Sequence, residues 1–501
     1  MISQGVLGFQ YESEVGRSGM TGLSGLLLYL DLAEAASLSR SLERHLRLRE
    51  GGQGWTDRQI VMALICLNLA GGDCVEDLRI LASDEGFSRV LRRVEQHGMP
   101  RRQRRAQDRR WRSERKRSVP SPSAVFRYLA SFHDAEQEKL RVSGKAFIPR
   151  PSEALLGLGR VQEEFLRFVQ SRRPETVATL DMDATLIETS KSESLYCYQS
   201  FRAYQPLNVW WAEQGLVAHT EFRDGNVPAG YEQLRVLQES LARLPPGVET
   251  VRLRSDSAGY QHELLRYCAQ GDNERFGKID FAVSADVTTE FKRAVARVEA
   301  SWWKPLGQDG EQEWAEVCFV PDPIGRSRKS PEYRYLAIRE PLRQRVLPGC
   351  EEQGALPLAT VPMSGELYKV FGVVTTLAWE GEAVIGWLRE RCGKSEEAHA
   401  VMKEDLAGGK LPSGDFGENA AWWSMMILAF NLNAAMKKLV LGTGWESKRM
   451  KALRFGLIRL PGRVLEHARR LRVRLSAGHP AIPLLRTARQ RILQLAQAGA
   501  G

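Results

Sequence analysis

Cysteine is scarce in this chain, and long apolar runs are missing from it. The seven cysteines are scattered without CxxC spacing, which argues against a zinc cluster or disulfide framework and favours a reducing cytoplasm. The longest apolar stretches are 61–70, which is too short to span a bilayer, and 422–436, which carries two asparagines. The first residues, MISQGVLGFQYESEVGR, lack a basic region followed by an apolar core. We therefore expect no signal peptide and no membrane partner.

Acidic residues are fewer than basic ones, 61 against 71, which gives a formal net charge of +10. Apolar residues make up 43% of the chain and charged residues 26%, the balance of a folded protein with a sizeable core. A length of 501 residues corresponds to several ordinary domains. The basic excess permits a polyanionic partner without requiring one.

Two segments concentrate the positive charge. Residues 101–117 hold ten Arg or Lys and two acids, and residues 448–491 hold thirteen and one. Such basic segments can be solvated loops or solvated helix faces. The leucines of segment 448–491 can also pack one face of that segment against the rest of the protein. Both basic segments can also contact DNA phosphates. The residues that we predict to contact DNA are Arg101, Arg102, Arg104, Arg105, Arg109, Arg110, Lys403, Arg469, Arg470, Arg472 and Arg474.

Apolar periodicity divides the chain into five regions. It predicts a helical region over 1–145, which we expect to bind DNA through its basic arm, and the first part of a mixed α/β domain over 146–286. A β-rich insertion over 287–375, a long helix with closing helices over 376–445 and a basic helical tail over 446–501 follow. Two local signals are specific: Thr56 is expected to cap a helix, and Gly215 to turn a hairpin.

Several acids stand where chemistry can use them. Asp181 and Asp183 end a predicted strand and share one face, because side chains alternate along a strand. Asp256 ends a later strand, and Glu396 lies in a predicted helix, seven residues before Lys403. Carboxylates that converge in this way can hold Mg²⁺, and a pair of such ions supports phosphoryl transfer.

The segment from Asp181 to Thr185 also fits the D-x-D-x-T pattern of haloacid dehalogenase-like phosphatases. In that alternative, Asp181 is a nucleophile, Asp183 a general acid and Ser255 part of a second motif. The later parts of the pattern are missing apart from a loose match at Asp286, and the long helical region before the first strand has no place in it.

Several motifs occur in order along nearly the whole chain. They are Gly72-Asp-Cys-Val-Glu-Asp-Leu, Leu180-Asp-Met-Asp-Ala-Thr, Tyr204-Gln-Pro-Leu, Leu253-Arg-Ser-Asp-Ser-Ala and Leu411-Pro-Ser-Gly. At these residues the chain resembles bacterial insertion-sequence transposases of the DDE group-1 type, the branch related to piggyBac elements.

The resemblance implies a catalytic triad. The triad is Asp183, Asp256 and Glu396, with Asp181 and Glu397 as neighbouring alternatives among the metal ligands. It further implies that the catalytic domain has an RNase H-like mixed sheet. The implied cofactor is two Mg²⁺ ions, which Mn²⁺ can replace. The implied reaction is cleavage and strand transfer of DNA at terminal inverted repeats. The implied partner is double-stranded DNA, both the repeat ends and the target, bound by a homodimer or larger assembly at the nucleoid. A descendant that binds DNA without catalysis is the other hypothesis.

Overall fold

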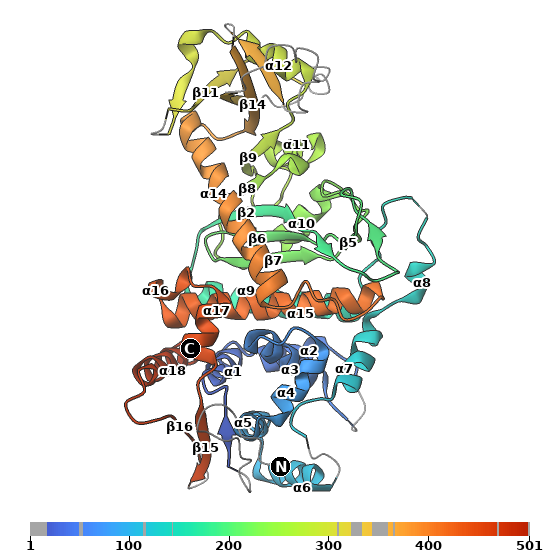
Figure 1. Cartoon of the computed structure of the whole chain (residues 1–501), viewed down its shortest axis with the longest axis vertical. Helices are drawn as coiled ribbons and strands as arrows, with labels where there is room; N and C mark the ends of the chain where they lie inside the picture. The colour runs from blue at the N-terminus through green and yellow to red at the C-terminus, as the bar shows by residue number, and fades with distance from the viewer. Residues whose placement is uncertain are drawn as a thin grey trace, which may run out of the picture. The chain divides into compact units, whose positions relative to one another are not determined.

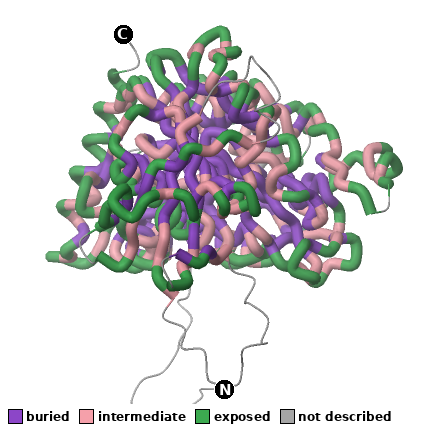
Figure 2. The backbone as a smooth tube through the Cα atoms, turned by 90° about the horizontal axis from the view of Figure 1, so that it is seen from above, coloured by how far each residue is buried: buried purple, intermediate pink, exposed green. Residues whose placement is uncertain are grey.

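The computed structural model describes residues 18–49, 54–113, 117–142, 144–307, 310–321, 333–342, 359–363, 366–467 and 470–498. Two compact units divide the chain, and each is assembled from separate stretches. Unit 1 combines Met1–Gln137, Arg150–Phe165 and Val401–Gly501, and unit 2 combines Glu138–Pro149 and Leu166–Ala400. Buried residues lie inside and exposed residues outside (Figure 2).

Unit 1 is mainly helical. Its N-terminal elements are β1 (Met20–Thr21), α1 (Leu26–Ala35), α2 (Leu38–His45), α3 (Asp57–Ala70), η1 (Val75–Asp77), α4 (Leu78–Ser83), α5 (Glu85–Glu95), α6 (Arg101–Ser113), α7 (Pro122–Leu129) and η2 (Ala130–Phe132). Its C-terminal elements are η5 (Val401–Asp405), α15 (Phe416–Ala435), η6 (Met436–Leu441), α16 (Thr443–Glu446), α17 (Met450–Leu453), η7 (Arg454–Ile458), β15 (Gly462–His467), β16 (Arg470–Arg474) and α18 (Ala481–Gln497). The helices α8 (Ala135–Glu138) and α9 (Glu153–Arg172) cross the division between the units.

The core of unit 1 is built on α15, which is buried nearly all round and packs against α3. Phe416–Leu441 is long and apolar enough to cross a membrane by composition alone, but 72% of its most apolar window is buried inside the protein. Within this helix Asn433 accepts a hydrogen bond from the Tyr29 hydroxyl at 2.8 Å. A buried polar side chain needs a hydrogen-bond partner, and Tyr29 supplies one to the Asn433 amide, as a helix in a protein core requires.

The predicted cap at Thr56 is confirmed. The Thr56 hydroxyl accepts a hydrogen bond from the Gln59 N–H, and the Gln59 side chain accepts one from the Thr56 N–H. This reciprocal box starts α3, and Gly71 ends the helix in the left-handed region, with φ +88°.

The prediction of a helical tail was wrong for one segment. Gly462–His467 and Arg470–Arg474 form an antiparallel hairpin, and β15 also pairs with β1. Val464 is fully buried while Arg463 is exposed, so the local period is two. The many arginines concealed this alternation in the sequence.

Unit 2 is built around a large mixed sheet (Figure 1). Its strands follow the order β10-β11-β12-β14-β9-β8-β2-β6-β7, and β13 pairs with β14. The strands are β2 (Val177–Ala184), β6 (Leu207–Trp211), β7 (Leu216–Glu221), β8 (Thr250–Ser255), β9 (Asp280–Ala285), β10 (Lys304–Leu306), β11 (Gln312–Val317), β12 (Arg334–Pro341), β13 (Thr360–Met363) and β14 (Glu366–Thr375). A separate small sheet contains β3 (Ile187–Glu188), β4 (Leu195–Tyr196) and β5 (Arg202–Tyr204).

The strands of the predicted insertion extend the main sheet. Strand β14 runs antiparallel to β9, and β12, β11 and β10 continue outward from β14. The predicted hairpin at Gly215 is confirmed: β6 and β7 are antiparallel, and Gly215 has φ +68°.

Helices cover this sheet. They are α10 (Gln233–Arg243), η3 (Ser257–Gly259), α11 (His262–Gln270), α12 (Thr289–Ala296), η4 (Ala300–Trp302) and α14 (Gly381–Ala400). Helix α14 contacts β2, β8, β9 and β11. Its apolar residues Val384, Ile385 and Leu388 pack in one cluster with residues such as Trp314 of β11. This packing holds α14 across the strands that carry the predicted aspartates.

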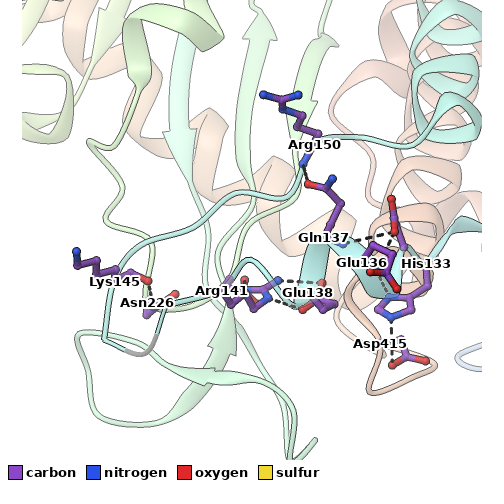
Figure 3. Close-up of polar contacts among 12 residues, drawn as sticks. His133, Glu136, Gln137, Glu138, Arg141, Lys145, Arg150, Asn226 and Asp415 are labelled. Carbon is purple, nitrogen blue, oxygen red and sulfur yellow. Dashed lines mark hydrogen bonds and ion pairs between the residues drawn. The ribbon is translucent and has the colours of Figure 1, made fainter.

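The short stretch Glu138–Pro149 is fastened to unit 2 by polar contacts (Figure 3). The Arg141 guanidinium pairs with Glu138 and with the buried Asp224, and the Asn226 amide donates to the Lys145 carbonyl at 3.1 Å. Burial raises the pKa of Asp224 to about 6, and Arg141 opposes that rise. One arginine therefore anchors this stretch to the loop that carries Asp224.

Candidate active site

Asp183 and Asp256 lie at neighbouring strand ends of unit 2. Strands β2 and β8 are parallel, and Met182 pairs with Ser255, so the next residue on each strand is one of the two aspartates. Asp256 follows β8 directly and caps η3, where its Oδ1 accepts a hydrogen bond from the Ala258 N–H at 3.0 Å. The carboxyl ends of adjacent parallel strands thus bring these two carboxylates together, as the sequence predicted.

Asp183 is enclosed by charged groups from α14. Its Oδ2 lies 3.1 Å from Nη1 of Arg391 and 3.9 Å from Nδ1 of His399. The pKa of Asp183 is raised to about 6, chiefly by burial and further by the neighbouring carboxylates of Asp256 and Asp181, although the Arg391 guanidinium opposes the rise.

Asp181 has a different environment from Asp183. Arg254 holds it with two hydrogen bonds, Nε to Oδ1 at 2.6 Å and Nη2 to Oδ2 at 2.8 Å. Both side chains are almost fully buried, and Arg254 also donates to the Trp387 carbonyl at 2.7 Å. Burial raises the pKa of Asp181, and the Arg254 guanidinium opposes that rise. This pair ties β2, β8 and α14 together.

The arrangement around Asp181 disfavours the phosphatase alternative. A nucleophilic carboxylate must present an oxygen to the substrate. Both oxygens of Asp181 are occupied by Arg254, and its side chain is only 3% exposed. Asp183, with a side chain 20% exposed, is the more accessible of the two.

Glu396 and Glu397 are not brought to the aspartates. Both are exposed on α14, whose buried face carries Arg391, Ser395 and Ala398. Within the part of the chain that the structure describes, no three His, Cys, Asp or Glu side chains form a group that could hold a metal ion. The convergence of three acids predicted from the sequence is therefore absent from the described conformation, because the helix turns Glu396 outward.

Three site residues were missed by sequence reasoning, namely Arg254, Arg391 and His399. A signal for Arg391 exists, since it lies three residues after Leu388 and seven after Val384, on the apolar stripe of the helix. The signal for Arg254 is its place in the strand, directly after Leu253 and two residues before Asp256. An arginine inside a buried strand needs a carboxylate partner.

Comparison with known proteins decides the family. The family described as transposase DDE domain group 1 matches residues 15–497. The chain belongs to this DDE transposase family. No curated protein matches it. Among solved structures, it is similar to a piggyBac transposase synaptic complex with hairpin DNA, at 11% identity and a TM-score of 0.41, over 86% of this chain and 79% of that chain.

In this family member, residues 101–113 of the first basic segment form α6. Arg101, Arg102, Arg104, Arg105 and Arg109 are all exposed on it, and the side chain of Arg110 lies outside the described residues. Two polar residues attach α6 to the end of α5: Gln96 donates to Asp108 at 2.6 Å, and Gln107 donates to Glu95 at 3.4 Å. The arginines are therefore exposed to solvent on a helix that two hydrogen bonds attach to the end of α5.

The second basic segment borders a groove of about 840 Å³ in unit 1. Arg472 and Arg474 of β16 line it together with Arg486 of α18, and all three are exposed. No carboxylate among the described residues forms an ion pair with these three side chains. Arg470 is exposed at the start of β16, Lys403 is partly buried in η5, and Arg469 lies outside the described residues.

Proposed function

We propose that this chain is a DNA transposase that binds the terminal inverted repeats of an insertion sequence and catalyses metal-dependent cleavage and strand transfer. The observation that carries the proposal is the placement of Asp183 and Asp256 at the ends of the adjacent parallel strands β2 and β8, in a member of the DDE family. The pKa of Asp183, raised by burial, supports it, because active sites concentrate such groups.

We further propose that the catalytic core is RNase H-like. The strand order β7-β6-β2-β8-β9 supports this assignment, because β6 runs antiparallel to its neighbours β7 and β2, while β8 and β9 run parallel to β2. The catalytic aspartates would then stand on the first and fourth of these strands in chain order.

The cofactor in this proposal is a pair of Mg²⁺ ions, with Mn²⁺ able to replace them. Asp183 and Asp256 have the right chemistry, since hard cations prefer carboxylate oxygens. The described residues nevertheless do not fit a pair of ions, because Arg391 pairs with Asp183 and Glu396 faces outward. The same two observations favour the second candidate function, a transposase-derived protein that binds DNA without cutting it.

The proposed DNA contacts lie in unit 1. Exposed arginines on α6 and around the groove at β16 supply positive charge for phosphates of the repeat ends and of the target DNA. A homodimer or a larger assembly on DNA, in the cytoplasm at the nucleoid, completes the proposal, because two ends of one element must be processed together.

A nicking assay tests this function. The substrate is a duplex that carries the inverted repeats flanking the reading frame, with Mg²⁺ or Mn²⁺ added. We expect Asp183→Asn and Asp256→Asn each to abolish nicking while the affinity for the duplex stays within about twofold, because neither residue lies in the basic segments. Glu274→Gln, which changes an exposed acid of unit 2, is the control and should nick normally.

The two candidate functions give different results. Wild-type protein that binds the repeat ends and never nicks them would establish the non-catalytic alternative. Normal nicking by Asp256→Asn would remove Asp256 from the site.

A further inference from the structure

A short hairpin leaves the main sheet of unit 2 directly after the strand that carries Asp183. Strand β3 begins at Ile187, four residues after Asp183, and pairs with β5, which in turn pairs with β4. Figure 1 shows β5 on the side of the main sheet toward which β2 runs. The hairpin of β4 and β5 therefore lies near the edge of the sheet at which Asp183 is found.

The base of this hairpin is packed into unit 2. Tyr204 of β5 is 1% exposed, and its ring stacks on Phe222 with the centroids 4.9 Å apart. Gly225 lies so close to the hairpin that a β-carbon there would clash with the carbonyl oxygens of Ala203 and Leu195. These contacts fix the hairpin to the end of the sheet.

The turn at the tip of the hairpin is also well defined. The Ser200 N–H donates to the Cys197 carbonyl at 3.0 Å, and the Cys197 N–H donates to the Phe201 carbonyl at 2.9 Å. Ser200 has φ +66°, the left-handed conformation that closes a three-residue hairpin loop. This conformation is strained for a residue other than glycine, and strain of this kind clusters at functional sites.

Two tyrosines are exposed at this tip. Tyr196 is 60% exposed and Tyr198 is 75% exposed, whereas Cys197 between them is buried. Both rings therefore lie on the outer side of the hairpin, where they contribute little apolar burial to the folded state. Exposed side chains on a loop that a rigid scaffold positions are typical of binding residues.

The charges beside the two rings indicate the chemistry of the partner. The Arg202 guanidinium lies over the Tyr196 ring, 4.8 Å from its centroid, and two backbone carbonyls of the loop 189–194 accept hydrogen bonds from it. Residues 189–202 hold two basic residues and one acid. The exposed Lys145 adds a further cation, because its carbonyl accepts a hydrogen bond from Asn226, next to Gly225 at the base of the hairpin (Figure 3).

We propose that the hairpin binds single-stranded DNA by stacking unpaired bases on the rings of Tyr196 and Tyr198. The proposal rests on the proposed function, in which DNA is the partner. Every nucleobase has a π-face, so such a surface accepts unpaired bases without reading their sequence, and basic side chains beside it attract the phosphates. An intact duplex does not fit in the same way, since each internal base is already covered by its neighbours.

The first test is binding of an oligothymidylate of about sixteen nucleotides, measured by fluorescence anisotropy in EDTA at several salt concentrations. We expect Tyr198→Ala to lower the affinity about tenfold and to leave the salt slope unchanged, because a stacked base releases no counterions. Tyr198→Phe should keep the wild-type affinity, because the ring makes the contact and the hydroxyl does not.

Tyr231→Ala is the matched control for this test. Tyr231 is an exposed tyrosine of the same unit, shortly before α10, and its change should leave the affinity unaltered. Equal affinity of Tyr198→Ala and Tyr231→Ala for the oligothymidylate overturns the proposal. If Tyr198→Ala instead weakens self-association in sedimentation velocity, the tip is a contact between two copies of the chain.

A second measurement reports the stacking itself. An oligothymidylate that carries 2-aminopurine at several positions loses fluorescence when these bases stack on an aromatic ring. At saturating protein, where every oligonucleotide is bound, we expect the wild type to quench the fluorescence more strongly than Tyr198→Ala does. Equal quenching by the two proteins overturns the proposal.

The outcomes distinguish this proposal from the proposed function. A Tyr198→Ala protein that nicks the repeat ends and binds the oligothymidylate as the wild type does overturns the hairpin contact and leaves the transposase assignment intact. Single-strand binding that depends on Tyr198, in a protein that never nicks DNA, supports the hairpin contact and overturns the assignment of catalysis.

Discussion

The carboxyl group of Asp183 links protonation to folding. Its pKa is about 6 in the folded protein against 3.8 for an unperturbed aspartate, chiefly because it is buried. Between these values the folded state holds a proton that the unfolded chain has lost, so raising the pH favours unfolding. The loss of folding stability that comes from ionising Asp183 is absent below pH 3.8 and complete above pH 6.

We expect the free energy of unfolding of the wild type, minus that of Asp183→Asn, to fall by about 2 to 4 kcal/mol between pH 4 and pH 7. The subtraction removes constant effects, such as the loss of a partner for Arg391. Urea denaturation in EDTA at several pH values measures this difference. A difference that does not change with pH means that burial does not raise this pKa.

At the scale of elements, the basic groove of unit 1 makes a distinct prediction. If Arg472, Arg474 and Arg486 contact DNA phosphates, their joint change to Gln weakens binding to all sequences alike. The salt slope of the binding constant should fall by about two to three units, since each lost contact removes about one. A fluorescence anisotropy titration of a labelled duplex between low and moderate salt gives both slopes.

Arg79→Gln is the matched control for the groove. Arg79 is an exposed arginine of the same unit, on α4, and it pairs with Glu76 at 2.8 Å. Its change should leave the slope unaltered. If the triple variant and the control have the same slope, the hairpin and α18 serve packing and do not bind DNA.

The elements differed in how far the sequence could predict them. Local signals mark the cap at Thr56, the turn at Gly215 and the strand Val177–Ala184, and such a signal does not depend on the rest of the chain. The hairpin Gly462–His467 with Arg470–Arg474 was missed because charge hid its alternation.

The side-chain contacts of the site could not be predicted in the same way. The ion pair of Asp181 with Arg254 depends on the register of two strands that are distant in sequence. The outward position of Glu396 depends on which residues of α14 pack on the sheet, namely Arg391, Ser395 and Ala398 in its second half, and no large apolar residue marks that face after Leu388 in the sequence.

At the scale of the whole molecule, unit 1 depends on both ends of the chain. Helix α3 packs on α15, and α1 packs on α18, so each apolar surface is covered by a partner from the other end. We expect fragments 1–409 and 410–501 to be insoluble when expressed separately and to recover together on co-expression. The cut falls beside the exposed Lys410, between η5 and α15. A soluble, cooperatively unfolding 1–409 fragment would contradict the assignment of α15 to the core.

The interleaving of the units also fixes when the protein can finish folding during its synthesis. The ribosome completes the sheet of unit 2, with Asp183 and Asp256, before it makes α15, which the N-terminal helices need as their partner. A nascent or prematurely terminated chain therefore carries these two aspartates before its helical unit can fold. Because α15 and α18 complete unit 1, we expect incomplete products to stay open to proteases.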